Sequence, residues 1–155
     1  SHLARLTFGC LAPCGYPFSD LELHLSKGSM ASNDFASVAM QFVQHYYNTF
    51  DTNRNGLAPL YGEASMLTFE DAQFKGVQQI MQKLNSLQFQ QIRHQVIKVD
   101  SQPSVNNGIL VFVTGTLMVD NEANPLKFAQ VFHLQPNAQG GGYYCFNDLF
   151  RLNIG

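Results

Sequence analysis

The stretch that decides the fold is DFASVAMQFVQHYYNTFDTN, residues 34–53. Its apolar and aromatic residues recur at alternating steps of three and four, which is the spacing of one face of an α-helix. These residues are Phe35, Val38, Ala39, Phe42, Val43, Tyr46, Tyr47 and Phe50. The spacing predicts one long amphipathic helix. Ser32 or Asn33 caps its start, and Asp51-Thr52-Asn53 ends it because these side chains compete for backbone hydrogen bonds.

Two shorter helices are predicted around Leu57–Tyr61 and Val77–Leu84, with short extended pieces at 65–69 and 73–75 between them. After Phe89 the period drops to two, which indicates strands. The four predicted strands are Gln91–Asp100, Ile109–Asp120, Leu126–Pro136 and Tyr143–Leu152. Asn, Asp and Gly residues between them tolerate positive φ and favour antiparallel hairpins. The pattern predicts an α+β fold with the long helix lying on one face of an antiparallel sheet.

The composition excludes several functional classes. A chain of 155 residues that is 45% hydrophobic can bury a core as one domain. Nine Lys and Arg against eleven Asp and Glu, a net charge of -2, supply no basic stripe, so we expect no direct nucleic-acid binding. No apolar run approaches about 20 residues and no secretory signal is present, which predicts an intracellular protein without membrane insertion. Three cysteines with no metal-ligand spacing predict neither a disulfide framework nor a metal or cofactor.

The first 29 residues differ in character from the rest. Gly28-Ser29-Met30 resembles a cloning junction ahead of a native initiator, so we divide the chain into an N-terminal extension, 1–29, and a domain, 30–155. The extension is interpreted as fused or vector-derived, but its apolar residues favour an ordered segment with a short strand at 21–25. Its role, and whether Cys10 and Cys14 bridge, stay open.

Motifs of catalysis are absent from the sequence: it has no phosphate-binding loop, no Gly-x-Ser-x-Gly and no His-Glu-x-x-His. Two acidic groups stand out instead, Phe69-Glu70-Asp71 and Asp120-Asn121-Glu122. Both place carboxylates beside apolar residues. One interpretation is an acidic rim around an apolar pocket, suited to a partner that offers Lys or Arg beside an inserted apolar side chain. The alternative is that Asp120 and Asn121 serve only the turn.

Five further segments, taken together and in order, resemble the nuclear transport factor 2 family. They are FVQHYYNTFDTNR (42–54), LAPLY (57–61), ASMLTFE (64–70), KLNSLQFQ (83–90) and FNDLFRL (146–152). The resemblance covers about residues 31–155. It implies a cone-shaped α+β fold with a curved, mainly antiparallel sheet, a homodimer formed through that sheet, and no catalysis.

The resemblance also implies partners. The family carries the GDP-bound form of the small GTPase Ran into the nucleus and binds the FxFG repeats of nuclear pore proteins, so we expect the chain in the cytoplasm, the nucleus and the nuclear pore. The family's Ran site is a hydrophobic cavity ringed by acids, which takes an aromatic side chain of switch II. In this sequence the corresponding residues are Phe69, Glu70, His94, Asp120 and Glu122. The corresponding FxFG-binding residue is Phe35, although its phase also permits a purely structural role in the helix stripe.

Two other functions remain as alternatives. The same fold hosts isomerases and dehydratases, for which His94 and a cavity carboxylate would be the acid and base. Related adaptor domains serve RNA export and stress granules as dimeric scaffolds. The end of the chain at Gly155, directly after the last predicted strand, favours the stand-alone transport factor.

Overall fold

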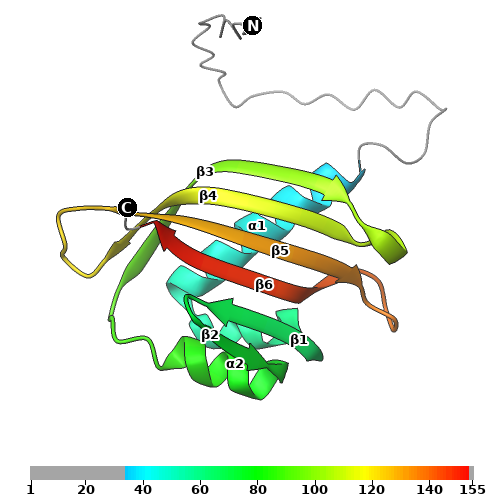
Figure 1. The fold of residues 1–155 in the computed structure, drawn as a ribbon, viewed down its shortest axis with the longest axis horizontal. Helices are drawn as coiled ribbons and strands as arrows, with labels where there is room; N and C mark the ends of the chain where they lie inside the picture. Colours follow the sequence, from blue (N-terminus) through cyan, green and yellow to red (C-terminus); the bar gives the residue numbers. More distant parts are fainter. Residues whose placement is uncertain (1–33, 154–155) are drawn as a thin grey trace, which may run out of the picture. The chain divides into compact units, whose positions relative to one another are not determined.

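The computed structural model describes residues 34–153, which form a six-stranded sheet with helices packed against it (Figure 1). Its elements are α1 (Asp34–Thr52), the 3-10 helix η1 (Arg54–Leu60), β1 (Tyr61–Phe69), β2 (Ala72–Lys75), α2 (Gly76–Asn85), β3 (Ile92–Pro103), the 3-10 turn η2 (Val105–Asn107), β4 (Ile109–Val119), β5 (Leu126–Pro136) and β6 (Tyr143–Asn153). The predicted extension 1–29, its strand and the predicted cap at Ser32 or Asn33 lie outside the described residues.

Helix α1 ends at Thr52, as its sequence predicts. Its buried residues lie on the predicted stripe: Ala39, Phe42, Val43, Tyr46, Tyr47 and Phe50. The Thr52 hydroxyl donates to the Asn48 carbonyl at 2.7 Å and closes the last turn. Figure 1 shows α1 lying across one face of the sheet, so this stripe forms the core with the strands. No helix in the part of the chain that the structure describes is long and apolar enough to cross a membrane.

The strand order in the sheet is β2-β1-β6-β5-β4-β3. Strands β3 to β6 pair as consecutive antiparallel neighbours, which confirms the predicted hairpins. The turn residues adopt the positive φ angles that their types allow: Asn106 at 55°, Asn107 at 57° and Asp120 at 50°. Local turn chemistry therefore sets the connections on this side of the sheet.

The sheet is mainly antiparallel, as predicted, but the sequence did not show how the extended pieces at 65–69 and 73–75 join it. Strands β1 and β2 precede α2 and still join the sheet, and β1 pairs with β6 in parallel. No hairpin signal marks this pairing because the two strands lie far apart in the chain. This one parallel pairing makes the sheet mixed.

The predicted helix at 57–61 is a 3-10 helix that stops one residue earlier. Tyr61 is extended, with φ -113° and ψ 152°, and begins β1. Pro59 within the helix has no N–H to donate, which limits its regular hydrogen bonding. Tyr61 is only 5% exposed, so the switch to strand places its ring in the core.

Strand β3 forms one edge of the sheet and carries a register shift between Val96 and Lys98. Gly115 of β4 lies opposite this irregularity, where a Cβ would stand closer than van der Waals contact to the Gln95 carbonyl and 3.0 Å from the Phe128 ring. A glycine is therefore required here for close approach of β3 and of Phe128.

Candidate docking site

An apolar cavity of about 180 Å³ lies between α1 and the strands, with residues of α2 and of the segment before β3 completing its wall. Most of its lining is aromatic or aliphatic, including Phe50, Leu67, Phe89, Leu117 and Leu126. Such a concave apolar surface is suited to an inserted apolar group. Two of the residues predicted from the sequence, Phe69 and His94, line this cavity.

Phe69 packs into the wall of the cavity. Its ring stacks on Phe150 with the centroids 4.7 Å apart and the planes 15° from parallel. The Lys83 ammonium lies 5.1 Å from the centre of the Phe69 ring, within cation–π range. Phe69, at the end of β1, is thus held by the C-terminal part of β6 and by α2.

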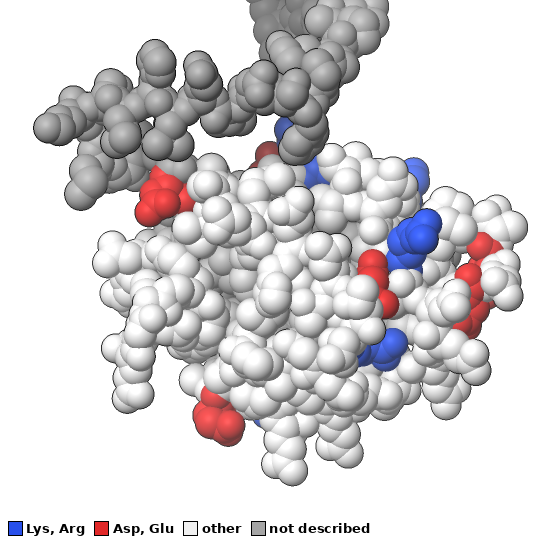
Figure 2. Space-filling model, turned by 180° about the vertical axis from the view of Figure 1, so that it is seen from behind, with Lys and Arg blue, Asp and Glu red and all other residues white. Residues whose placement is uncertain are grey.

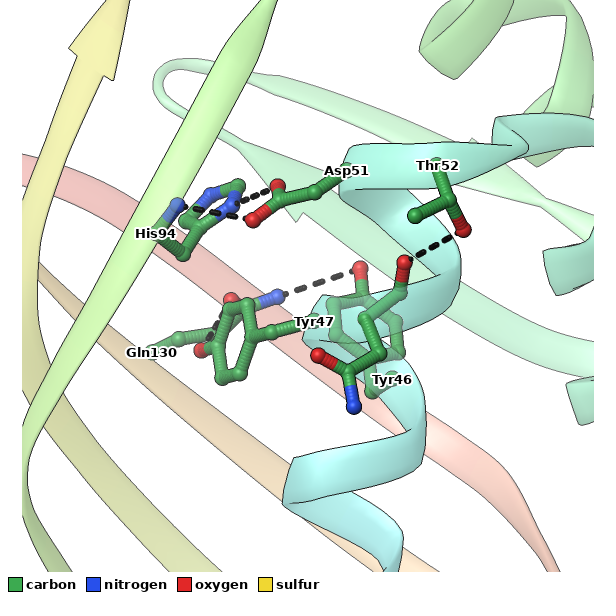
Figure 3. A network of polar contacts seen from close by, with 7 residues as sticks. Tyr46, Tyr47, Asp51, Thr52, His94 and Gln130 are labelled. Carbon is green, nitrogen blue, oxygen red and sulfur yellow. Dashed lines mark hydrogen bonds and ion pairs between the residues drawn. The ribbon is translucent and has the colours of Figure 1, made fainter.

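His94 on β3 is fixed by Asp51 at the end of α1 (Figure 3). Its Nδ1 lies 2.6 Å from Asp51 Oδ1, and its backbone N–H donates to Asp51 Oδ2 at 2.9 Å. The imidazole also packs against the rings of Tyr47, Phe50 and Phe128 and is only 3% exposed. One carboxylate therefore holds both the backbone and the ring of His94.

Glu70 lies beside the cavity at the turn from β1 to β2. Its backbone N–H donates to the Phe150 carbonyl at 3.0 Å, and its Oε1 accepts from the backbone N–H of Leu152, a cavity residue. Arg151 approaches the second Glu70 oxygen at 4.0 Å and the exposed Asp71 carboxylate at 3.2 Å. Glu70 is thus a partly exposed carboxylate held against the cavity wall, with a cation beside it.

Asp120 lies on another side of the cavity. Its Oδ1 accepts from the backbone N–H groups of Gln90 and Gln91, both at 2.9 Å, and these residues lie between the lining residues Phe89 and Ile92. Asp120 also borders a surface hollow that shares Phe89 with the cavity. Asp120 adopts the positive φ of 50° that its place in the turn requires, and its side chain binds a segment distant in the chain beside the cavity.

Glu122 lies two residues further along the turn that joins β4 to β5. It is exposed, and its backbone N–H closes the turn on the Val119 carbonyl at 3.1 Å. The two ends of this turn, Val119 and Leu126, line the cavity, but Glu122 itself does not. The structure brings Phe69, Glu70, His94 and Asp120 together at or beside the cavity, with Glu122 outermost.

A buried polar network lies behind the cavity and was not predicted from the sequence. Asp148 is fully buried and accepts from Tyr61 Oη at 2.7 Å, Gln130 Nε2 at 2.7 Å and Tyr46 Oη at 3.3 Å. Tyr47 Oη donates to Gln130 Oε1 at 2.8 Å, which orients the amide nitrogen toward Asp148. Figure 3 shows the Gln130 amide joined to both tyrosines: it accepts from the Tyr47 hydroxyl and donates to the Tyr46 hydroxyl.

Burial dominates the electrostatics of this network. It raises the pKa of Asp148 from 3.8 to about 6, although the three hydrogen bonds to the carboxylate oppose the rise. Burial also raises the pKa of Tyr46, Tyr61 and Cys145, and the nearby Asp148 charge adds to each rise. These groups stay neutral near pH 7, and Asp148 is the one charge among them.

Sequence reasoning missed two partners that position the site. Asp51 was assigned only to the end of α1, and nothing local reveals that it pairs with a residue 43 positions later. Asp148 did leave a signal, because it alternates with Phe150 and Leu152 along a predicted strand and so shares their face. A charged residue on an apolar strand face indicates a buried, hydrogen-bonded group.

Phe35 lies apart from these residues, in the first turn of α1. Its side chain is partly buried and packs against the core, as the structural interpretation of the helix stripe expects.

Figure 2 shows one face of the molecule. This face carries few charged side chains, with both signs interspersed and no broad basic region. Among residues 34–153, no group of three His, Cys, Asp or Glu is arranged to hold a metal ion.

Comparison with known proteins places this architecture in a family. Residues 38–152 match the family described as the nuclear transport factor 2 (NTF2) domain. Nuclear transport factor 2B of Arabidopsis thaliana is 56% identical over 125 residues, covering 80% of this chain and 98% of that protein. The solved nuclear transport factor 2 of Cryptosporidium parvum shares 55% identity, with a TM-score of 0.74 over 78% of this chain and 96% of its own.

Solved structures of low sequence identity share the fold of this chain. A putative scytalone dehydratase from Novosphingobium aromaticivorans superposes with a TM-score of 0.63 at only 14% identity, over 79% of this chain and 89% of its own. The fold is therefore shared with proteins of other kinds. The high identity over nearly the whole length of the two nuclear transport factor 2 proteins, in contrast, is specific to that family. The predicted fold class is confirmed, and the chain belongs to the nuclear transport factor 2 family.

Proposed function

We propose that the chain is a nuclear import carrier that binds the GDP-bound form of the small GTPase Ran and moves between cytoplasm and nucleus through the nuclear pore. The observation on which this rests is the apolar cavity bordered on separate sides by Glu70 and Asp120. The names and high identity of the relatives support a transport role rather than catalysis.

In this proposal the cavity takes an aromatic side chain of Ran, and the rim carboxylates pair with cations beside it. Phe69 and His94 form part of the wall, while Glu70, Asp120 and Glu122 provide the charge. Asp120 Oδ1 is occupied by two backbone donors, so its other oxygen is the one offered to a partner. Truncating one member of a buried interfacial charge pair costs about 2–5 kcal/mol.

Selection of the GDP-bound form needs no contact with the nucleotide. The switch segments of a GTPase rearrange with the γ-phosphate, and a cavity that accepts one arrangement of an aromatic side chain discriminates between the two states. The carrier therefore distinguishes the two nucleotide states through the conformation of the Ran switch segments.

We further propose a homodimer formed through the face of the sheet that α1 leaves uncovered. Phe112, Val131 and Leu149 lie side by side across β4, β5 and β6 in the strand register. Phe112 is 43% exposed and Leu149 49% exposed. A row of exposed apolar side chains on a sheet face is typical of a protein interface. We assign the domain to residues 30–155 and FxFG binding to the surface around Phe35.

The decisive experiment is a pull-down with Ran in its GDP and GTP forms, using Glu70→Lys. We expect the wild-type chain to bind Ran-GDP selectively and Glu70→Lys to lose that binding while remaining dimeric. Because Glu70 also accepts from the Leu152 backbone, Glu70→Gln provides a second variant that keeps an acceptor oxygen and removes the charge.

Glu63→Lys, at an exposed position of β1, makes the same change of charge away from the cavity and serves as the matched control. It should bind Ran-GDP normally. Equal binding by Glu70→Lys and Glu63→Lys would refute the assignment of the docking site.

A further inference from the structure

Three hydrogen bonds connect polar residues on the face of the sheet that α1 leaves uncovered. His133 and Gln135 lie on this face of β5, because the residues on either side of His133 are buried in the core. Gln135 Nε2 lies 2.8 Å from His133 Nε2 and 3.3 Å from the Val105 carbonyl of η2. His133 Nδ1 lies 3.3 Å from Asn147 Oδ1 of β6. The network thus joins η2, β5 and β6.

This network matches a neutral imidazole. An amide nitrogen carries two N–H groups and accepts nothing, so Gln135 donates one to the Val105 carbonyl and one to His133 Nε2. Turning the amide over would set its oxygen against the Val105 carbonyl oxygen, which also only accepts. With Nε2 accepting, Nδ1 carries the ring proton and donates it to Asn147. A second proton, on Nε2, would point at the Gln135 N–H.

Gly108 brings the end of η2 directly onto these two side chains. A Cβ at this position would stand 3.0 Å from His133 Nε2, 2.9 Å from the Leu134 carbonyl and closer still to Gln135 Nε2. A glycine permits this close approach. The backbone therefore packs against the pair formed by His133 and Gln135 and closes one side of the ring nitrogen.

His133 stands beside the exposed apolar row that carries the proposed dimer. Leu110, opposite His133 on β4, is exposed. Val131, the preceding residue of β5 on this face, belongs to the row with Phe112 and Leu149. His133 itself is half-buried within one copy of the chain. A second copy that covers Leu110 and Val131 therefore removes His133 from water as well.

Among residues 34–153, no carboxylate stands beside His133 in the strand register, where its neighbours are Leu110 and Asn147. The Phe146 ring lies 6.1 Å from the imidazole, centre to centre. The titratable and charged residues of the same sheet face stand opposite other residues: Arg93, Lys98 and Asp100 on β3, Lys127 on β5, and Tyr144 and Arg151 on β6. A proton on His133 would thus be covered by a second copy without a counter-charge.

We propose that the dimer is sensitive to pH and that His133 is the responsible group: its protonation weakens association through the face of the sheet. This inference rests on the dimer of the proposed function. A protonated ring sets an N–H against the N–H of Gln135 and so breaks their hydrogen bond. Burial of the resulting cation between two copies, without a paired carboxylate, opposes association.

The direction of the pH dependence follows from linkage. Histidine changes its charge between about pH 5 and pH 8. Because the separated copies bind this proton better than the dimer does, a fall in pH favours the separated copies. A symmetric dimer contains His133 twice, so two protons oppose its formation. In return, dimerisation shifts proton uptake by His133 to lower pH.

The experiment measures the dissociation constant of the dimer by sedimentation equilibrium at about pH 7.5 and about pH 5.5, on either side of the histidine titration. It compares the wild type with His133→Gln and His45→Gln. The glutamine of His133→Gln stays neutral, and its oxygen can accept from Gln135. His45 is exposed on α1, which covers the opposite face of the sheet (Figure 1), so His45→Gln is the matched control.

We expect the dissociation constants of the wild type and His45→Gln to rise at least about tenfold at the lower pH, and that of His133→Gln less than about threefold. Asp148 titrates in the same interval in all three proteins, so the comparison removes its contribution. An equal rise in the wild type and His133→Gln, or no rise in the wild type, overturns the proposal.

If His133→Gln does not fold, the wild type alone decides. The 15N resonances of His133 must then titrate at lower pH in concentrated, dimeric samples than in dilute, monomeric ones, and identical titrations overturn the proposal. A chain that is monomeric at neutral pH overturns both this inference and the proposed dimer, whereas a dimer whose association does not depend on pH overturns this inference alone. The Ran pull-down at neutral pH is independent of these measurements.

Discussion

The substitution Asp148→Asn tests whether the buried network behaves as its surroundings require. Burial raises the pKa of Asp148 from 3.8 to about 6. Between these two values the folded protein binds a proton at Asp148 while the unfolded chain does not, so this carboxyl stabilises the fold at low pH and the stabilisation is lost as pH rises through about 6. At about 1.4 kcal/mol per pKa unit, the difference corresponds to about 3 kcal/mol.

The asparagine side chain of this variant would keep the shape of the aspartate and remove its titration. Its oxygen can accept from Gln130, and its amide N–H groups can donate to the hydroxyls of Tyr46 and Tyr61, which rotate to accept. We therefore expect the variant to fold and to lack this part of the pH dependence.

The assay is urea unfolding of both proteins at a series of pH values from about 4 to 7, with the free energy of unfolding compared at each pH. The wild type should lose up to about 3 kcal/mol relative to Asp148→Asn as pH rises across this interval, and the difference should level off above about pH 6. A constant difference, or a wild type that gains relative to the variant with rising pH, would refute the reasoning.

Three further predictions concern other parts of the chain. Phe112→Glu places a charge in the exposed apolar row of the sheet, and sedimentation equilibrium should show at least about a tenfold weaker dimer without loss of the fold; an unchanged dimer would place the interface elsewhere. Phe35→Ala should weaken binding to FxFG peptides by about tenfold or more in fluorescence anisotropy, because a buried Phe ring contributes about 1.5–3 kcal/mol; wild-type affinity would leave Phe35 with a structural role only. Gly115→Ala should lower the free energy of unfolding by about 1–3 kcal/mol, because its methyl group meets the Gln95 carbonyl and the Phe128 ring; denaturation at the wild-type midpoint would contradict this.

Local patterns in the sequence were sufficient for most elements of the fold. The three- and four-residue spacing of apolar residues predicted α1, and the period-two pattern predicted β5 with its observed bounds, Leu126–Pro136. The Asn and Asp residues of the turns predicted where φ becomes positive. These predictions succeed because each depends on neighbours in the chain.

Contacts between distant segments could not be obtained in this way. Two such contacts are the parallel pairing of β1 with β6 and the hydrogen bond between Asp51 and His94. Both depend on how separate helices and strands pack in three dimensions. The acids of the rim were identified from family resemblance and apolar neighbours, but their backbone partners were not. When a carboxylate accepts from a backbone N–H that is distant in the chain, no regular residue spacing in the sequence indicates the hydrogen bond.

The bond from the His94 backbone N–H to Asp51 also bears on how the protein avoids forming fibres. Strand β3 is an edge, and an edge with free N–H and C=O groups can recruit strands from other molecules without limit. Asp51 occupies one of those donors, the irregularity at Val96 and Lys98 interrupts the row, and Pro103 ends it without an N–H. At the opposite edge, β2 is only four residues long. The proposed assembly through the face of the sheet would close after two copies, whereas assembly through its edges would not.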